Sequence, residues 1–463
     1  MGLGSLDALP YTVKNCVRRV IPVNDIKGYY TPHYHFKSQL YKILKDNWQE
    51  FLSIYPAKYQ SRYGELKDYQ KITVEKFLAC SNPHNVFSYV ECTNKKCANH
   101  YIVPFTCGCE ICPSCNEKNV LQFSDWVISE ILFNVAHKHT VLTIPQDLRE
   151  YFRAEPNLLG YLANTAGEML IYLSRESAKG VYTKPYRKID IPDDAMPGII
   201  VRIETSGSDI RYNCHIHALE TCGCYSPKDK EDYYYPSRFI PYQVLRHTWM
   251  NKVLSLLLNF GKITFDEMKK IKAKYKNGFN VNSTIRDHIG DNELMYRQAQ
   301  YIQKAPLSET RIVDYNSKTK KVEILFRRKD FDSKHKGYST ETITALELIA
   351  RLIQHIHYPY MHYTRYYGTY SVKRRGLRRK ENKKSNPNET GKNRKDYRKS
   401  WAKLIWKVYG ADPLECPVCG SDMKITDIVT TDIENKLKRL NIREWYYKTG
   451  DEVHKIVKAR DSP

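Results

Sequence analysis

Two histidines in alternate positions, His215 and His217, have the spacing in this sequence that most directly suggests chemistry. They lie in a short apolar run, 213–220, that is typical of a β-strand. Because residues two apart in a strand point to the same face, both imidazoles would lie side by side while Cys214 and Ile216 face the other way. Such a pair can bind a metal ion, although strand histidines are more often exposed or hydrogen-bonded.

The sequence also predicts a carboxylate, that of Glu204, beside the two imidazoles. The segment 199–205 also alternates, with isoleucine and valine on one face and charged residues on the other. The short, turn-rich connection 206–209 then predicts an antiparallel hairpin. Since cross-strand neighbours share a face, Glu204 would lie beside the histidines. Two imidazoles and a carboxylate suit a divalent ion with open coordination positions.

Six cysteines within 92–115 form the strongest local pattern. Two pairs on two turns can close a tetrahedral thiolate site around Zn²⁺, which is the expected use of such spacing in a reducing compartment. We expect the four ligands to be Cys92, Cys97, Cys112 and Cys115. Two further cysteines would replace one of these or hold a second ion: Cys107 and Cys109.

A later pair, Cys416 and Cys419, has the spacing of half a zinc ribbon and lacks the other half locally. Its partners would be other cysteines in the fold or cysteines of a second subunit. The sequence Cys222-Gly223-Cys224 is interpreted as a structural turn.

The segment 291–306 begins with acidic residues and ends at a proline, which predicts one helix. It carries Tyr296 and Tyr301. A phenol titrates near roughly 10 and is a weak nucleophile, but beside a metal-bound phosphate it can attack phosphorus and form an ester. The chain contains 37 tyrosines, so packing is the alternative role for either residue.

Charge and length narrow the class of protein. At 463 residues the chain exceeds the roughly 250–300 at which single cores stop growing, so we expect several domains. A net charge of +23 with 12% aromatic residues favours a polyanionic partner, with nucleic acid first. A membrane surface is the competing explanation, but no apolar run nears the roughly 20 residues of a spanning helix, and no signal peptide is evident. We expect an intracellular protein with no membrane partner.

Aromatic residues alternate with cations near 360–370, and a basic run follows through 373–399. This composition can stack bases and follow a single strand. The run is expected to be disordered when free and phosphate-bound when working, with a solvated linker as the alternative. The candidate DNA-binding residues are Arg365, Tyr366, Tyr367, Lys373, Arg374, Arg375, Arg378 and Arg379.

The elements that position these residues predict an α+β fold, an antiparallel sheet backed by helices. Helices are expected over 117–136, 156–177 and 345–357, and strands over 139–144, within 310–326 and over 338–344. The expected domains are a helical lead-in (1–90), a zinc knuckle (91–117), the histidine-bearing domain (118–310), C-terminal strands and a helix (311–370), a basic linker (371–400) and a C-terminal helix with the cysteine-pair ribbon (401–463).

Taken in order, these motifs resemble the HUH-type single-strand transposases of insertion sequence family 91 and its common-region relatives. The resemblance covers roughly 90–430. Its marks are Thr106-Cys107, Cys112-Pro113-Ser114-Cys115, Thr205-Ser206-Gly207-Ser208-Asp209, His215-Ile216-His217, Tyr301-Ile302-Gln303-Lys304-Ala305-Pro306-Leu307, Arg365-Tyr366-Tyr367-Gly368 and Cys416-Pro417-Val418-Cys419-Gly420.

The resemblance implies an HUH endonuclease that cuts and rejoins single-stranded DNA in rolling-circle-type transposition. The histidine pair would hold Mg²⁺ or Mn²⁺ on the scissile phosphate, and a tyrosine would attack to leave a 5′-phosphotyrosine and a free 3′-hydroxyl. Zn²⁺ would be structural. A bacterial-type cytoplasmic, nucleoid-associated protein is implied, with a homodimer as one arrangement.

Family position implies Tyr301 as the first nucleophile. Many relatives carry a second tyrosine four residues earlier, where this sequence has Arg297 beside Tyr296. Five helical residues turn about 500°, so Tyr296 and Tyr301 would lie about 140° apart, which favours one tyrosine over two. The third metal ligand is Glu204 by strand parity or Gln300, and the latter would make Tyr296 the nucleophile.

Two other functions fit parts of the sequence. A replication initiator or relaxase would use the same chemistry, but it would not cut and join both ends of an element. A non-catalytic, zinc-dependent DNA-binding regulator would share the charge and the cysteines, yet it would not need the histidine pair or the tyrosine helix.

Overall fold

The structure, a computed structural model, describes residues 38–182, 190–226, 234–237, 240–285, 299–327, 338–385 and 414–439, apart from positions 83, 98, 134, 301, 304 and 417. The chain divides into two compact units. The smaller unit combines 1–46, 71–118 and 392–463, and the larger unit combines 47–70 and 119–391.

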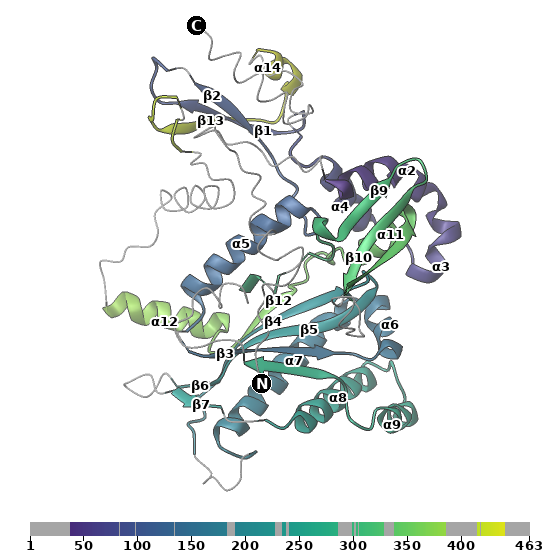
Figure 1. The fold of residues 1–463 in the computed structure, drawn as a ribbon. Coiled ribbons are helices and arrows are strands. Elements are labelled where there is room, and N and C mark those ends of the chain that lie inside the picture. The colour runs from purple at the N-terminus through teal and green to yellow at the C-terminus, as the bar shows by residue number, and fades with distance from the viewer. Residues whose placement is uncertain are drawn as a thin grey trace. The chain divides into compact units, whose positions relative to one another are not determined.

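A five-stranded antiparallel sheet lies at the centre of the larger unit, in the order β12-β4-β5-β3-β8 (Figure 1). Its strands are β3 (His137–Thr143), β4 (Gly198–Ser206), β5 (Tyr212–Thr221), β8 (Val281–Ile285) and β12 (Thr364–Gly368). The predicted hairpin is present as β4 and β5, with Glu204 opposite His215. The prediction of a mixed fold with an antiparallel sheet backed by helices is confirmed.

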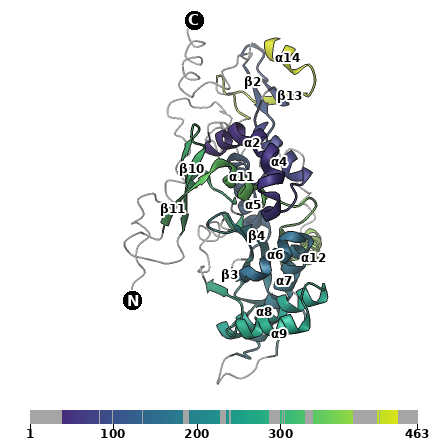
Figure 2. The same cartoon turned by 90° about the vertical axis from the view of Figure 1, so that its right-hand side faces the viewer.

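One face of this sheet carries the main core. Four helices lie on that side (Figure 2): α6 (Gln146–Ala154), α7 (Asn157–Ala178), α8 (Tyr242–Asn259) and α9 (Phe265–Lys274). Apolar residues recur three and four apart along α7, so one stripe of this helix is buried against the sheet. The strands contribute alternate residues, among them Ile203 of β4 and Ile216 of β5. Strand alternation therefore places His215 and His217 on the opposite face.

The histidine-bearing face has an apolar cluster of its own. Val127 of α5 (Pro113–Glu130) packs there with Ile200 and Leu219 of the sheet. Two residues flanking position 301, Ala299 and Ile302, belong to the same cluster and are fully buried. The segment predicted to carry the tyrosines thus contacts this face through its described residues.

A second antiparallel sheet follows in the larger unit, in the order β11-β10-β9. It consists of β9 (Ile312–Asn316), β10 (Lys321–Arg327) and β11 (Tyr338–Thr344), with the short turn η3 (Glu309–Arg311) before it and α11 (Ala345–Ile353) after it. These strands and this helix were predicted. Cys222 lies at a bend between β5 and β6 (Gly223–Tyr225), and β6 pairs with β7 (Tyr234–Pro236). Gly223 and Cys224 therefore lie in a strand, and the interpretation of this segment as a turn was right only for Cys222.

The basic run begins as a helix, α12 (Val372–Ser385). The prediction of a disordered linker was therefore wrong for this part. Arginine, lysine and leucine are good helix formers, and two arginines rest on aromatic rings. The guanidinium of Arg375 lies 4.7 Å from the ring centre of Tyr366, and that of Arg378 lies 4.4 Å from that of Phe133. The continuation to 400 lies outside the described residues.

The smaller unit contains a three-stranded sheet built from both ends of the chain. Strand β1 (Phe87–Cys92) pairs with β2 (His100–Pro104) on one side and with β13 (Met423–Val429) on the other. The helices of the described residues that have not yet been named, from either unit, are α2 (Gln39–Lys58), α3 (Gln60–Tyr63), α4 (Asp68–Leu78) and α14 (Ile433–Arg439). The pairing of β13 with β1 could not be predicted, because nothing local in either segment specifies it.

None of the helices in the described part of the chain combines the length and the apolar character that crossing a membrane requires.

Candidate metal centres

The two histidines of β5 direct corresponding ring nitrogens at each other. The Nε2 atoms of His215 and His217 are 3.0 Å apart. Two nitrogen ligands that share one divalent ion at right angles, each about 2.1 Å from it, are separated by about 3 Å. The pair therefore has the spacing that a shared ion requires.

Hydrogen bonds at the other ring nitrogens determine which atoms face the pair. His215 Nδ1 lies 2.7 Å from the carbonyl oxygen of Asn213, which can only accept, so Nδ1 donates and Nε2 keeps its lone pair in the neutral ring. His217 Nδ1 lies 2.9 Å from His139 Nε2. Burial, and secondarily the charge of Arg149, lowers the pKa of His215 and favours the neutral form that binds metals.

His139 is a part of this site that sequence reasoning missed. It lies on β3, next to β5, and its ring stacks on that of His217 with the centroids 5.1 Å apart. The run His137-Lys138-His139 repeats the alternate-histidine pattern, and this was the signal that could have found it. Donation of the His217 Nδ1 proton to His139 would leave His217 Nε2 free to bind a metal.

The third ligand stays a prediction. Glu204 lies opposite His215, as expected, but its carboxylate faces Arg202, with Nε and Oε1 3.4 Å apart. Among the described residues, no third histidine, cysteine or acidic group lies within 4.8 Å of both imidazole ligand atoms. Gln300 is half-buried and helical.

Both candidate nucleophiles, Tyr296 and Tyr301, lie outside the described residues, as does Arg297. The neighbours of position 301 are described. Ala299 and Ile302 are buried against the sheet face that carries the histidines. The chain on both sides of position 301 is therefore fixed to that face.

Eight cysteines form two groups of four, and within each group the sulfur atoms lie within 4.8 Å of one another. The first group is Cys80, Cys107, Cys112 and Cys115. The second group is Cys92, Cys97, Cys416 and Cys419. In the second group the Sγ atoms of Cys92 and Cys419 are 3.5 Å apart and those of Cys97 and Cys416 are 3.7 Å apart. Four thiolates around one Zn²⁺ at about 2.3 Å have separations of about 3.8 Å, so both groups fit this ion.

This grouping corrects the predicted ligand set, which combined Cys92 and Cys97 with Cys112 and Cys115. The two pairs separate because the first flanks the β1–β2 turn while the second lies at the start of α5. Cys80, just after α4, was missed because no second cysteine lies close to it in the sequence.

Two further cysteine predictions have clear outcomes in the structure. Cys109 joins neither group, and its thiol faces the carbonyl oxygen of Thr73 at 3.9 Å. Cys416 and Cys419 complete the second group from within the same chain, which was one of the two expected alternatives. The hydrogen bonds that Cys115 accepts from Cys107, Cys112 and Cys80 lower its pKa, so one thiolate is already favoured in the first group.

The candidate DNA-binding residues of β12 divide between the two sheet faces. Arg365 and Tyr367 both bond to the amide oxygen of Asn164 in α7, at 2.7 and 2.9 Å, on the face away from the histidines. Tyr366 lies on the histidine side, with its ring 5.7 Å from that of Trp126. Arg365 and Tyr367 therefore have a packing role that the sequence did not reveal.

Among the candidates in α12, the side chains differ in their surroundings. Arg374 and Arg378 each donate to a backbone carbonyl, of Asp194 and Thr369 respectively. Arg375 stacks on Tyr366 on the histidine side, and Lys373 is exposed. The side chain of Arg379 lies outside the described residues.

Comparison with known proteins now defines the class. A family model described as "Transposase zinc-binding domain" matches residues 45–144, and one described as "Putative transposase" matches residues 198–378. The first match runs from α2 through β3 and the second from β4 into α12, so both regions are similar to transposases that carry a zinc-binding domain.

More particularly, the chain is similar to the transposases of insertion sequence 91 and its relatives, and the resemblance noted in the sequence is confirmed. A protein described as "Transposase for insertion sequence element IS801", from Pseudomonas savastanoi pv. phaseolicola, is 25% identical over 382 residues. The match covers 79% of this chain and 86% of that protein. No solved structure matches the chain.

Proposed function

We propose that this transposase cuts and rejoins single-stranded DNA by HUH chemistry on the histidine-bearing face of the central sheet. The observation that carries the proposal is the 3.0 Å separation of the His215 and His217 Nε2 atoms. A DNA-binding regulator without catalysis would have no need for this matched pair. When bound there, Mg²⁺ or Mn²⁺ would polarise the scissile phosphate.

The residues of the chain have separate roles in this proposal. His215 and His217 hold the ion, and His139 orients the ring of His217. The hydroxyl of Tyr301 attacks phosphorus, so an Oη–P bond forms and the P–O3′ bond breaks. The products are a 5′-phosphotyrosine and a strand with a free 3′-hydroxyl, and the ester retains the bond energy for rejoining. Burial of Ala299 and Ile302 on the histidine face supports Tyr301.

We also infer that each cysteine group holds one structural Zn²⁺. Four thiolates close a tetrahedral site without an open position, which suits folding rather than catalysis. The two ions would stabilise the smaller unit, whose strands are short and whose elements come from both ends of the chain.

The decisive experiment compares Tyr301→Phe with Tyr296→Phe. Each purified variant is mixed with labelled single-stranded oligonucleotides from the ends of its element, with Mn²⁺ or with EDTA, and run on a denaturing gel. We expect a Mn²⁺-dependent covalent band from the wild type and Tyr296→Phe and none from Tyr301→Phe, although all three bind the DNA. An undiminished band from Tyr301→Phe would exclude this tyrosine as the nucleophile.

A further inference from the structure

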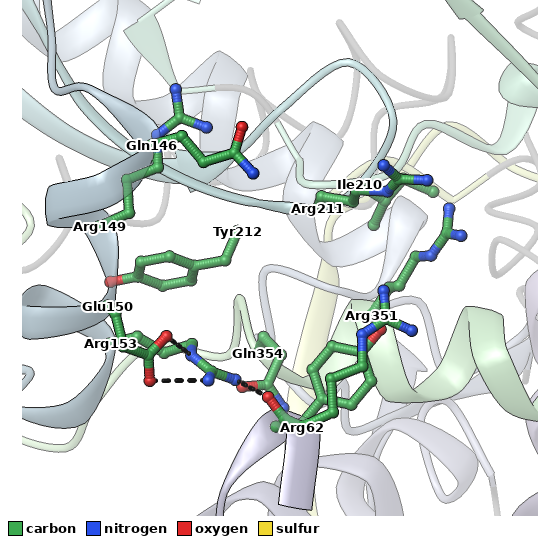
Figure 3. Close-up of a pocket in the computed structure, with 11 residues that line it drawn as sticks. Arg62, Gln146, Arg149, Glu150, Arg153, Ile210, Arg211, Tyr212, Arg351 and Gln354 are labelled. Carbon is green, nitrogen blue, oxygen red and sulfur yellow. Dashed lines mark hydrogen bonds and ion pairs between the residues drawn. The ribbon is translucent and has the colours of Figure 1, made fainter.

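A cavity of about 280 Å³ lies in the larger unit where β4 turns into β5. Figure 3 shows side chains of α6 on one side, Arg211 and Arg351 on the other, and Tyr212 between them. The lining contains five arginines and a single acidic residue, Glu150. This excess of positive charge predicts an anionic ligand, provided that carboxylates outside the lining do not already neutralise the arginines.

Acids do neutralise four of the five arginines. Arg153 pairs with Glu150 at 2.7 Å, and Arg62 and Arg351 share Glu347 at 3.2 and 2.9 Å. The other pairs are Arg351 with Glu341 at 3.1 Å and Arg211 with Asp209 at 3.6 Å. Four arginines are thus matched by four carboxylates, and the charge of these eight side chains sums to zero.

Arg149 is the unmatched charge. Its Nε donates to the carbonyl oxygen of Ile144 at 3.1 Å, and within the described chain its guanidinium has no carboxylate at ion-pair distance. The hydroxyl of Tyr212 is a second incompletely bonded group, because it is buried and, apart from the weakly accepting Cys214 thiol, has no hydrogen-bond partner among the described residues. A buried hydroxyl without a partner loses the hydrogen bonds that it made with water, so a ligand that accepts its proton would be favoured.

We propose that this pocket binds one phosphodiester group of single-stranded DNA, with Arg149 and the Tyr212 hydroxyl as its two donors. A phosphodiester carries one negative charge, which equals the surplus. The planar guanidinium fork matches two phosphate oxygens. Pockets for drug-sized ligands have volumes of roughly 300–1,000 Å³, so this one suits a fragment such as a single phosphate with its sugar.

The position of the pocket connects it to the histidine pair. Strand β3 ends at Thr143, which is the register partner of His215, and α6 begins three residues later with Gln146. Arg149 therefore lies at the same end of the sheet as His215. Since α6 and Tyr212 lie on the face of the sheet opposite the histidines, a strand whose scissile phosphate is at the histidines would have to pass around this end of the sheet to place a flanking phosphate in the pocket. The inference rests on the proposed function, since it takes single-stranded DNA as the substrate.

The test measures binding of a labelled oligothymidine in EDTA, so that it does not depend on catalysis. We expect Arg149→Gln to weaken binding about tenfold and to reduce the salt dependence by about 0.7 in log–log slope, the value for one single-strand phosphate contact. Tyr212→Phe should weaken binding severalfold and leave the slope unchanged. Lys269→Gln, which removes one exposed charge on α9, is the matched control and should bind as the wild type does.

Thermal unfolding establishes that each variant is folded. If Arg149→Gln does not fold, the binding measured with Tyr212→Phe decides the test. Wild-type binding by the folded variants would overturn the pocket and leave the proposed function standing. A wild type that binds no oligothymidine but binds thymidine 3′,5′-bisphosphate through Arg149 would refute the proposed substrate and keep the pocket. Competition by inorganic phosphate that equals that of the bisphosphate would overturn the assignment to DNA.

Discussion

His217 is held from two sides, by His215 at Nε2 and by His139 at Nδ1. The alternation of β5 was enough to predict that His215 and His217 share a face, because that pattern is local. The alternate histidines at 137 and 139 were a local signal, but assigning His139 to this site required the register between β3 and β5, and Cys80 required the return of the chain past α4. The roles of Tyr296, Tyr301, Glu204 and Gln300 stay predictions.

At the scale of single residues, we predict that His139→Phe lowers the affinity for Mn²⁺ about 10-fold to 100-fold, the usual cost of losing a group that orients a metal ligand. Phenylalanine keeps the stacked ring but has no acceptor for the His217 Nδ1 proton. Titration calorimetry with Mn²⁺ measures the change. His139→Gln, which restores an acceptor, should recover most of the affinity, whereas wild-type binding by His139→Phe would show that His217 needs no such partner.

The helices and strands were predictable wherever one face of the element is apolar. The stripe along α7 and the alternation of β4 and β5 are of this kind. Helix α12 was not, because it has no apolar face and its arginines pack on aromatic rings elsewhere in the fold. The same is true of Arg365 and Tyr367, whose contacts depend on two glycines of α7. An alanine Cβ at Gly160 would lie 2.7 Å from the end of the Arg365 side chain, and one at Gly167 would lie 2.7 Å from the Tyr367 ring.

These two glycines give a paired prediction for the element. Gly167→Ala should lower the free energy of unfolding by about 1–3 kcal/mol, because the Tyr367 ring is held by Asn164 and cannot move aside. Gly160→Ala should change it by no more than about 1 kcal/mol, because only the terminal Nη2 atom of Arg365 must shift, which is not the atom that bonds to Asn164, and because alanine favours the helix. Urea unfolding measures both. Equal stability of the two variants would show that the packing of α7 on β12 is not tight.

At the scale of the whole molecule, the sequence predicted the order of the motifs but not their grouping in space. The order could be predicted because each motif is short and the motifs follow one another along the chain. The grouping of the cysteines was not, because Cys97 and Cys416 are 319 positions apart yet their sulfur atoms nearly touch. Only the pairing of β13 with β1 brings the C-terminal pair to the first hairpin. The smaller unit is therefore closed by contacts between distant segments.

This closure predicts a zinc content that depends on the C-terminal segment. The wild type should hold two Zn²⁺ per chain, and the double variant Cys416→Ser with Cys419→Ser should hold one, because a site with two thiolates left loses most of its affinity. Cys109→Ser is the matched control, since this cysteine lies outside both groups, and it should keep two. Elemental analysis of the purified proteins gives the counts.

Two ions in the double variant would mean that other ligands close the second site, and one ion in the wild type would mean that only one group binds zinc. The first group should keep its ion in the double variant, because all four of its cysteines lie between α4 and the first turn of α5 and need nothing from the C-terminal segment.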